Sequence, residues 1–345
     1  MSATASDDAP PLRVPKSRLN TAQSLAPLRV LSLTGGGYRG LFTAQVLVDL
    51  CGLTRQPGRL DRAIDVFAGT SIGGLMACAL AIGVAPRRVL DAIDEHGPSV
   101  FPGKRQRTLR RIVFGTLYDA TNLRKAIEEC LGKTGARTKL KDVKKGLVVP
   151  AVDWINGRTE WYTSGALGKS LAQDVTLLDV CLATSAAPTY FPPHEVDGTP
   201  MLDGGLVSNN PDAGALIEIG RRWPERMSRV EMLSIGTAGS DIKRSSRTAS
   251  KPGAKWAVSL ATFMMTVQER SASTSATRLL GRRYLRVNHE PTEPHDAFDS
   301  MDVVTEHTRQ ALLNAGQATA LAAYKTHRAF IDRMLNEHRG QGASR

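Results

Sequence analysis

Two glycine-containing segments carry residue types that acyl transfer or phosphate binding requires. The first, Gly35 to Gly40 (GGGYRG), follows a short apolar run and precedes a helical pattern. It fits the G-x-G-x-x-G pattern, in which a tight turn directs several backbone N–H groups toward one negatively charged group. That group is either the pyrophosphate of a dinucleotide or the oxyanion of an acyl-transfer intermediate. This segment alone does not choose between them.

The second segment, Gly69-Thr70-Ser71-Ile72-Gly73, fits the pattern G-x-S-x-G and again lies between a strand-like run and a helical pattern. In a nucleophile elbow of this kind, the glycines relieve crowding in a sharp turn and the serine projects at a helix N-terminus. The helix dipole there favours developing negative charge. A dinucleotide-dependent oxidoreductase has no use for such a second turn. The two segments together therefore favour serine-dependent acyl transfer.

A serine hydroxyl needs a base, and the sequence offers two kinds. Asp203 is followed by Gly204 and Gly205, which let the backbone come close to a serine loop and leave the carboxylate within hydrogen-bond reach. Partial desolvation would raise the carboxyl pKa from about 3.9 and make it a better general base. His289 or His295 could instead complete a Ser-Asp-His triad, although neither lies in a recognisable motif.

Alternating strand-like and helical segments predict the framework that positions these residues. The strand-like runs are 28–34, 64–68, 147–152, 160–163, 230–235 and 284–287. The helical segments are 41–50, 75–82, 86–95, 121–131, 176–184, 212–222, 256–280 and 302–338. We expect an α/β protein with three layers (α/β/α), a mainly parallel central sheet and a helical C-terminal extension.

Four regions are expected along the chain. Residues 1–27 form an N-terminal arm, 28–240 a catalytic core, 241–255 a basic loop, and 256–345 a C-terminal strand and helices packed on the core.

The chain is strongly basic, with 45 Lys and Arg against 33 Asp and Glu and a formal charge of +12 over 345 residues. This excess favours an anionic partner such as nucleic acid, lipid headgroups or a phosphorylated ligand. Aromatic residues make up only 5% and no nucleic-acid-recognition motif is present, so we expect no nucleic-acid polymer. The segment Lys104 to Arg111 is the candidate contact for anionic lipid or for the phosphates of an activator.

The four cysteines lie far apart and form no C-x-x-C pair, which argues against a structural zinc site and against a disulfide framework. No apolar run reaches the roughly 18 residues of a membrane-spanning helix, and the first twenty residues lack the apolar core of a signal peptide. We therefore expect a cytoplasmic protein.

Three motifs, in this order and context, resemble those of the patatin-like phospholipase family. They are Gly35 to Gly40, Gly69 to Gly73, and Asp203-Gly204-Gly205. The resemblance covers roughly residues 28–240 and includes the stretch Ala183 to Phe191 (ATSAAPTYF). It implies a patatin-like fold and a Ser-Asp dyad without histidine or metal, in which Ser71 is the nucleophile and Asp203 the base. The activity it implies is the hydrolysis of glycerolipid acyl esters.

The resemblance also implies the rest of the site. The glycine loop forms the oxyanion hole (Gly35, Gly36, Gly37, Tyr38, Arg39 and Gly40), the nucleophile elbow includes Gly69, Thr70, Ile72 and Gly73, and the base loop includes Gly204 and Gly205. Arg39 is expected to brace the loop or a phosphate rather than to react. Thr34 departs from the pattern, because many bacterial members have aspartate before the three glycines.

In size, basic character and C-terminal helical extension, the chain is similar to the cyclic-nucleotide-activated phospholipases of bacterial CBASS anti-phage systems. This similarity implies a membrane phospholipid substrate, a cyclic di- or trinucleotide activator, no other cofactor, and peripheral contact with the inner membrane in the active state. A catalytically silent protein that binds a cyclic nucleotide or nucleic acid is the non-enzymatic alternative. A homo-oligomer is left open.

Overall fold

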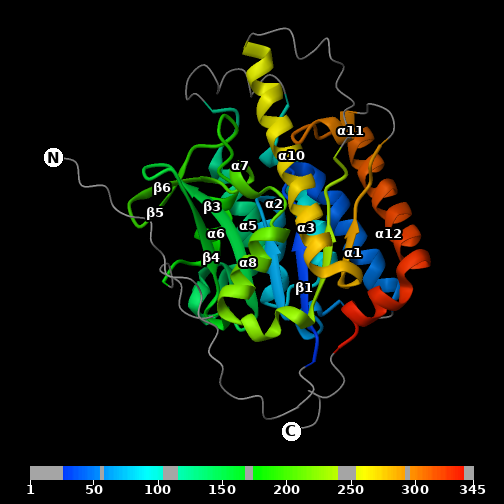
Figure 1. Cartoon of the computed structure of the whole chain (residues 1–345). Helices are drawn as coiled ribbons and strands as arrows, with labels where there is room; N and C mark the ends of the chain where they lie inside the picture. The colour runs from blue at the N-terminus through cyan, green and yellow to red at the C-terminus, as the bar shows by residue number, and fades with distance from the viewer. Residues whose placement is uncertain are drawn as a thin grey trace, which may run out of the picture.

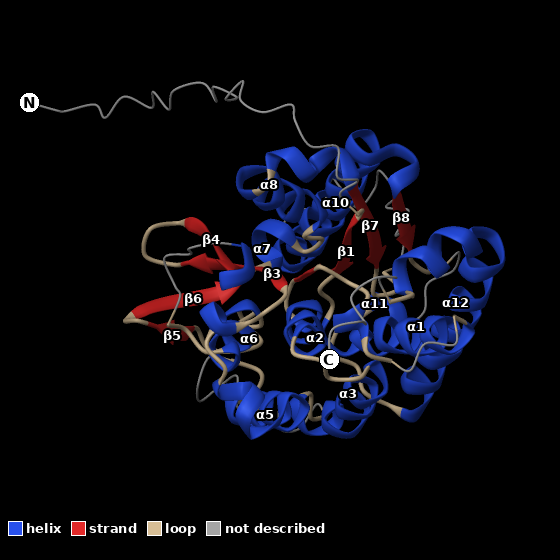
Figure 2. Ribbon diagram, turned by 90° about the horizontal axis from the view of Figure 1, so that it is seen from below, coloured by secondary structure: helices blue, strands red, loops and turns tan. Residues whose placement is uncertain are grey.

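The computed structural model describes residues 26–54, 58–103, 116–167, 174–239, 254–291 and 296–337. Within these residues, one eight-stranded sheet lies between two layers of helices (Figures 1 and 2). The expected arm over 1–27, the segment Lys104 to Arg111 and the basic loop over 241–255 lie wholly or almost wholly outside the described residues. The division into four regions therefore stays a prediction.

Five strands of the sheet pair in parallel with a neighbour, and the other three make antiparallel pairs alone. The parallel strands are β1 (Leu28–Leu33), β2 (Val66–Gly69), β3 (Gly146–Asp153), β7 (Val230–Ile235) and β8 (Tyr284–Val287). The antiparallel strands are β4 (Arg158–Thr163), β5 (His194–Val196) and β6 (Thr199–Asp203). Every residue of β1, which lies between β2 and β7, is buried, as expected of a strand covered on both faces.

The helices divide between the two faces of the sheet (Figure 2). One layer contains α1 (Gly40–Leu53), α2 (Ile72–Ala81), α3 (Pro86–Val100), α5 (Ala120–Arg137), α6 (Leu177–Thr184) and α12 (Glu306–Leu335). The other contains α7 (Gly205–Ser208), α8 (Asp212–Arg222) and α10 (Ala254–Leu280), and the short α11 (Asp296–Asp299) precedes α12. Short 3₁₀ helices are η1 (Gly37–Arg39), η2 (Leu60–Arg62), η3 (Leu140–Asp142), η4 (Gly165–Leu167), η5 (Pro224–Arg229) and η6 (Gly281–Arg283).

Alternate residues of the strands supply two hydrophobic cores. Leu31 and Leu33 pack with α1 and α2, whereas Leu28 and Val30 pack with α8 and the C-terminal end of α10. This alternation follows from the pleat, which turns successive side chains to opposite faces of the sheet. The predicted three-layer α/β class with a mainly parallel sheet is confirmed.

The pairing of β3 brings two distant strand ends together. β4 occupies one edge of β3 from Val148 to Asp153. The other edge is therefore shared, by β2 at Gly146 to Val148 and by β6 at Ala151 to Asp153. Because β2 runs parallel to β3 and β6 antiparallel to it, the C-terminal ends of β2 and β6 approach each other head to head.

The hairpin formed by β5 and β6 was not among the predicted strands. Its turn is Asp197-Gly198, with φ of 49° and 76°, and an Asp-Gly pair is a strong signal for such a turn. Asp203, by contrast, is the last residue of β6 and not part of the hairpin turn. The last predicted helix, 302–338, in fact begins at Glu306, where Thr305 forms a capping box with Thr308.

Candidate active site

Ser71 occupies a sharp turn between the end of β2 and the start of α2. Its backbone angles, φ 54° and ψ −125°, lie in a region that a non-glycine residue rarely adopts. A Cβ atom at Gly69 would collide with the carbonyl oxygen of Gly73, and one at Gly73 would collide with that of Leu33. Both flanking glycines are therefore required by close backbone approach, as expected of a nucleophile elbow.

Hydrogen bonds from other elements hold this strained turn. The Ser71 amide donates to Thr184 Oγ1 at 3.0 Å, and that hydroxyl donates to the carbonyl of Pro150 at 2.6 Å. Thr70 Oγ1 donates to the carbonyl of Ser208 at 2.6 Å. Strain of this kind costs about 1–3 kcal/mol and persists only where the surroundings fix it. Thr184 had no predicted role, because nothing local to it in the sequence indicates its contact with Ser71.

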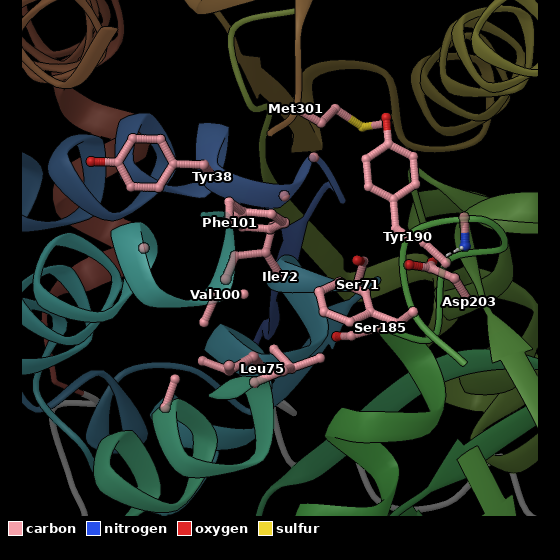
Figure 3. Close-up of a pocket in the computed structure, with 18 of the residues that line it drawn as sticks. Tyr38, Ser71, Ile72, Leu75, Val100, Phe101, Ser185, Tyr190, Asp203 and Met301 are labelled. Atoms are coloured by element: carbon pink, nitrogen blue, oxygen red, sulfur yellow. Dashed lines mark hydrogen bonds between the residues drawn. The ribbon is translucent and has the colours of Figure 1, made fainter. Parts of the chain in front are cut away.

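Asp203 ends β6 with its carboxylate buried beside the elbow (Figure 3). Its Oδ1 accepts a hydrogen bond from the Gly205 amide at 2.6 Å. Burial raises the pKa of this carboxyl to about 6, and the hydrogen bonds from the Gly205 amide and the Ser71 hydroxyl lower it only in part. Gly204 passes so near Pro150 that a Cβ would collide with the Pro150 carbonyl oxygen. The base loop thus has the close backbone approach that its glycines predict.

The glycine loop contributes fewer free amides than its sequence suggests. Four of its six N–H groups already donate to backbone carbonyls, namely those of Gly35, Tyr38, Arg39 and Gly40. Among the described residues, no partner is found for the amides of Gly36 and Gly37, and both glycines line the same pocket as Ser71. An oxyanion formed at Ser71 can therefore be stabilised by these two N–H groups, rather than by the whole loop.

The side chains of the loop point away from the serine. The Tyr38 ring is buried against Gly97, and its hydroxyl points away from Ser71 (Figure 3). Arg39 Nη1 donates to the carbonyl of Phe298, in α11, at 2.7 Å. Arg39 therefore braces the loop against α11, which is the first of the two roles expected for it.

The carbonyl of Gly35 is fixed by two donors that no sequence motif identified. Thr237 Oγ1 donates to it at 3.1 Å and Asn209 Nδ2 at 3.3 Å. Asn209 Nδ2 also donates to the carboxylate of Glu269 on α10. Helix α10 is thereby linked, through one amide side chain, to the loop that faces Ser71.

Thr34, which precedes the three glycines, contacts Arg286 of β8. Its hydroxyl accepts a hydrogen bond from Arg286 Nη1 at 2.7 Å, and Arg286 Nη2 lies 4.0 Å from the carboxylate of Glu269. The carboxylate beside Arg286 is therefore supplied by α10 and not by the residue before the glycines.

A pocket of about 430 Å³ opens beside Ser71, a volume within the usual range for small-ligand sites. Ser71, Asp203, Gly36, Gly37 and Ile72 all line it. Most of its remaining wall is apolar and comes from α2, α3, α5 and the segment after α6, with Leu75, Ile93, Val100, Phe101, Leu123, Ala126, Pro188, Tyr190 and Phe191. The pocket can therefore hold an apolar chain next to the hydroxyl of Ser71 and the carboxylate of Asp203.

The histidines considered for a triad do not join this arrangement. His289 packs between the rings of Phe42 and Phe298, with centroids 6.5 and 5.1 Å away, and does not line the pocket. His295 lies outside the described residues. His96 lines the pocket, but its Nε2 lies 2.7 Å from a carboxylate oxygen of Glu129. The described part of the chain contains no group of His, Cys, Asp and Glu side chains arranged to hold a metal ion.

Similarity to known families agrees with this geometry. The model of the family described as patatin-like phospholipase matches residues 31–216, a range that includes Ser71 and Asp203. The chain belongs to the patatin-like phospholipase family. It is thus a lipid acyl hydrolase, as the three sequence motifs indicated.

Proteins of bacteria and plants are similar to this phospholipase. It is 31% identical over 300 residues to a cGAMP-activated phospholipase of Pseudomonas aeruginosa, covering 85% of this chain and 88% of that one. A cGAMP-activated phospholipase of Vibrio cholerae is 33% identical over 249 residues, covering 66% and 69%. Patatin-like protein 1 of Arabidopsis thaliana is 29% identical over 268 residues, covering 66% and 63%.

Proposed function

We propose that this protein releases fatty acids from membrane phospholipids with Ser71 and Asp203 as a catalytic dyad, and that a cyclic oligonucleotide activates it. The observation that carries the dyad is the head-to-head approach of β2 and β6 on one edge of β3. It brings the serine and the carboxylate to the same pocket, where the Ser71 hydroxyl lowers the pKa of Asp203 as a hydrogen-bond partner.

The first half-reaction transfers the acyl group to the enzyme. Ser71 Oγ attacks the ester carbonyl while Asp203 takes the hydroxyl proton. The N–H groups of Gly36 and Gly37 stabilise the negative oxygen of the tetrahedral intermediate, a contribution worth about 10²- to 10³-fold in rate per donor. When the intermediate collapses, the lysolipid alkoxide leaves with the proton from Asp203 and the acyl group remains on Ser71 Oγ.

The second half-reaction returns the enzyme to its starting state. Asp203 removes a proton from a water molecule, whose oxygen attacks the acyl carbon. The collapse of the second tetrahedral intermediate gives the fatty acid and restores the hydroxyl of Ser71, which receives the proton from Asp203. A carboxyl with a pKa of about 6 is ionised at neutral pH and yet basic enough for both steps.

The activation by a cyclic oligonucleotide is supported by the relatives. Two bacterial relatives at 31% and 33% identity are named cGAMP-activated phospholipases, and the first aligns over 85% of this chain. A formal charge of +12 also favours an anionic ligand. We propose that this activation serves anti-phage defence, in which release of membrane fatty acids disrupts the membrane of the infected cell.

The test is fatty-acid release from vesicles of phosphatidylethanolamine and phosphatidylglycerol, with and without a panel of cyclic di- and trinucleotides. The parent should release fatty acid, and at least one nucleotide should increase the rate. Ser71→Ala and Asp203→Asn should each lower the rate by about 10³-fold or more, with unchanged far-UV circular dichroism.

His289→Ala is the control, because His289 lies outside the pocket. This variant should keep the parental rate. If it lost the activity while Asp203→Asn kept it, a histidine triad would replace the dyad. If the parent released no fatty acid with or without a nucleotide, while a nucleotide still raised its melting temperature, it would be a nucleotide-binding protein without catalytic activity.

A further inference from the structure

Exposed apolar side chains gather on α7 and on the N-terminal half of α10, the helix that packs against α7. We call this surface the apolar rim, and it consists of five side chains with exposed fractions between 40% and 59%: Leu206, Val207, Phe263, Met264 and Val267. These are half of the ten large hydrophobic side chains that are exposed in the described part of the chain. Exposed apolar residues scattered singly are normal, but a group at the mouth of a pocket marks an interaction site.

The rim is continuous with the wall of the active-site pocket. Leu206 belongs both to the rim and to the pocket lining, and Met265, next to Met264 on α10, also lines the pocket. The helices α7 and α10 pack against each other, and Figure 1 shows the N-terminal end of α10 projecting from the molecule beyond α7. The pocket that holds Ser71 therefore shares Leu206 with the rim and meets it again at Met265 on α10.

We propose that the apolar rim is the surface with which this protein docks on a phospholipid bilayer. The inference rests on the proposed function, because a phospholipid must move an acyl chain from the bilayer into the pocket. A rim of apolar side chains inserted at the headgroup level removes water from that path, and burial of apolar surface drives the docking. No described helix has the length and apolar composition to cross a bilayer, so the rim would act as a peripheral contact.

The chain supplies matched control positions. Leu279 is 61% exposed, close to the 59% of Met264, and lies on the same helix. Fifteen residues separate the two positions, which at 1.5 Å per residue places them about 22 Å apart along α10. Ile217, on α8, is 62% exposed and provides a second control outside the rim.

The binding experiment uses flotation with vesicles of phosphatidylethanolamine and phosphatidylglycerol, in the full-length Ser71→Ala variant so that lipid is not consumed. Uncharged substitutions are chosen so that electrostatic attraction is unchanged. The pair Met264→Gln and Val267→Thr should weaken vesicle binding by about tenfold, because it removes apolar surface that docking would bury. Leu279→Gln with Ile217→Thr should bind within twofold of the parent.

A second measurement does not require loss of binding. Met264→Trp should show a blue shift of its added tryptophan fluorescence when vesicles are present, because its ring would enter the interface. Leu279→Trp should show none. Both substitutions replace exposed side chains, and their melting temperatures should match that of the parent.

Two results would overturn the proposal. The first is equal flotation of the rim pair and the control pair, or equal spectral response of the two tryptophan variants. The second is a change in oligomeric state, measured by light scattering, when the rim pair is introduced without any change in flotation, since the rim would then be a contact between copies.

Failure of the dyad gives a different result from failure of the rim. Flotation is measured without catalysis, so a difference between the rim and control pairs, together with no fatty-acid release by the parent protein, would refute the proposed hydrolysis alone. Active protein whose ratio of vesicle hydrolysis to hydrolysis of a soluble short-chain ester is unaffected by the rim pair would refute the rim alone.

Discussion

Replacing Asp203 by asparagine should stabilise the folded protein while it removes the proposed base. The pKa of this carboxyl is raised from 3.8 to about 6, chiefly by burial. Each pKa unit corresponds to about 1.4 kcal/mol, so holding the carboxylate ionised in the folded state costs about 3 kcal/mol at neutral pH. The amide that replaces it is nearly isosteric, and its oxygen would still accept a hydrogen bond from the Gly205 amide. The free energy of unfolding of Asp203→Asn should therefore exceed that of the parent by up to about 3 kcal/mol.

The sign of the effect with pH makes the prediction specific. Between about pH 4 and pH 6 the folded parent binds more protons than the unfolded chain, so its free energy of unfolding falls as pH rises through this window. The variant has no such group. The difference in free energy of unfolding between variant and parent should be near zero at about pH 4 and should approach about 3 kcal/mol at about pH 8.

Urea unfolding of parent and variant at both pH values measures this difference, with equal m-values as the condition for comparison. Asp212→Asn is the contrasting control, because that buried carboxylate accepts hydrogen bonds from Ser234, Asn210 and Tyr284 and should lose stability when replaced. The reasoning would be refuted if Asp203→Asn were no more stable than the parent at about pH 8, since burial would then impose no cost on the carboxylate.

Three further outcomes follow from the same geometry. The rate of ester hydrolysis should fall as pH decreases through about 6, because Asp203 becomes protonated and can no longer accept the Ser71 proton; a rate independent of pH there would exclude Asp203 as the base. Thr184→Val should lower the rate by about 10- to 100-fold in the same assay, because the Ser71 amide loses its acceptor and the turn is no longer fixed, whereas an unchanged rate would mean that the elbow holds itself. Tyr38→Phe should raise the free energy of unfolding by about 1 kcal/mol in urea, because the buried hydroxyl of Tyr38 has no partner among the described residues, and a loss of stability would reveal a partner.

Local patterns were sufficient to predict the two turns that carry the glycines. The strand, the glycines and the following helix are contiguous in each case, so their geometry is encoded within a few residues, and the collisions at Gly69 and Gly73 explain why. The five strands that pair in parallel with a neighbour were all predicted from their apolar runs.

What could not be predicted depends on contacts between distant segments. The amides of Gly35 and Tyr38 donate hydrogen bonds to the carbonyls of Asn209 and Met301. These bonds help to decide which amides of the glycine loop stay free. Neither Asn209 nor Met301 lies near the loop in sequence. The pairing of β6 with β3, which places Asp203, likewise joins segments that are distant in the sequence, and the Asp197-Gly198 turn of the β5–β6 hairpin is a local signal for it.

The head-to-head meeting of β2 and β6 also has a consequence for the synthesis of the protein. The serine and the carboxylate come from positions 71 and 203, and they become neighbours only when β6 has added to the edge of β3. A nascent chain that has not yet emerged beyond the hairpin would carry the nucleophile without its base. Under the proposed chemistry, an unfinished or truncated copy could not attack the lipids of the cell that makes it.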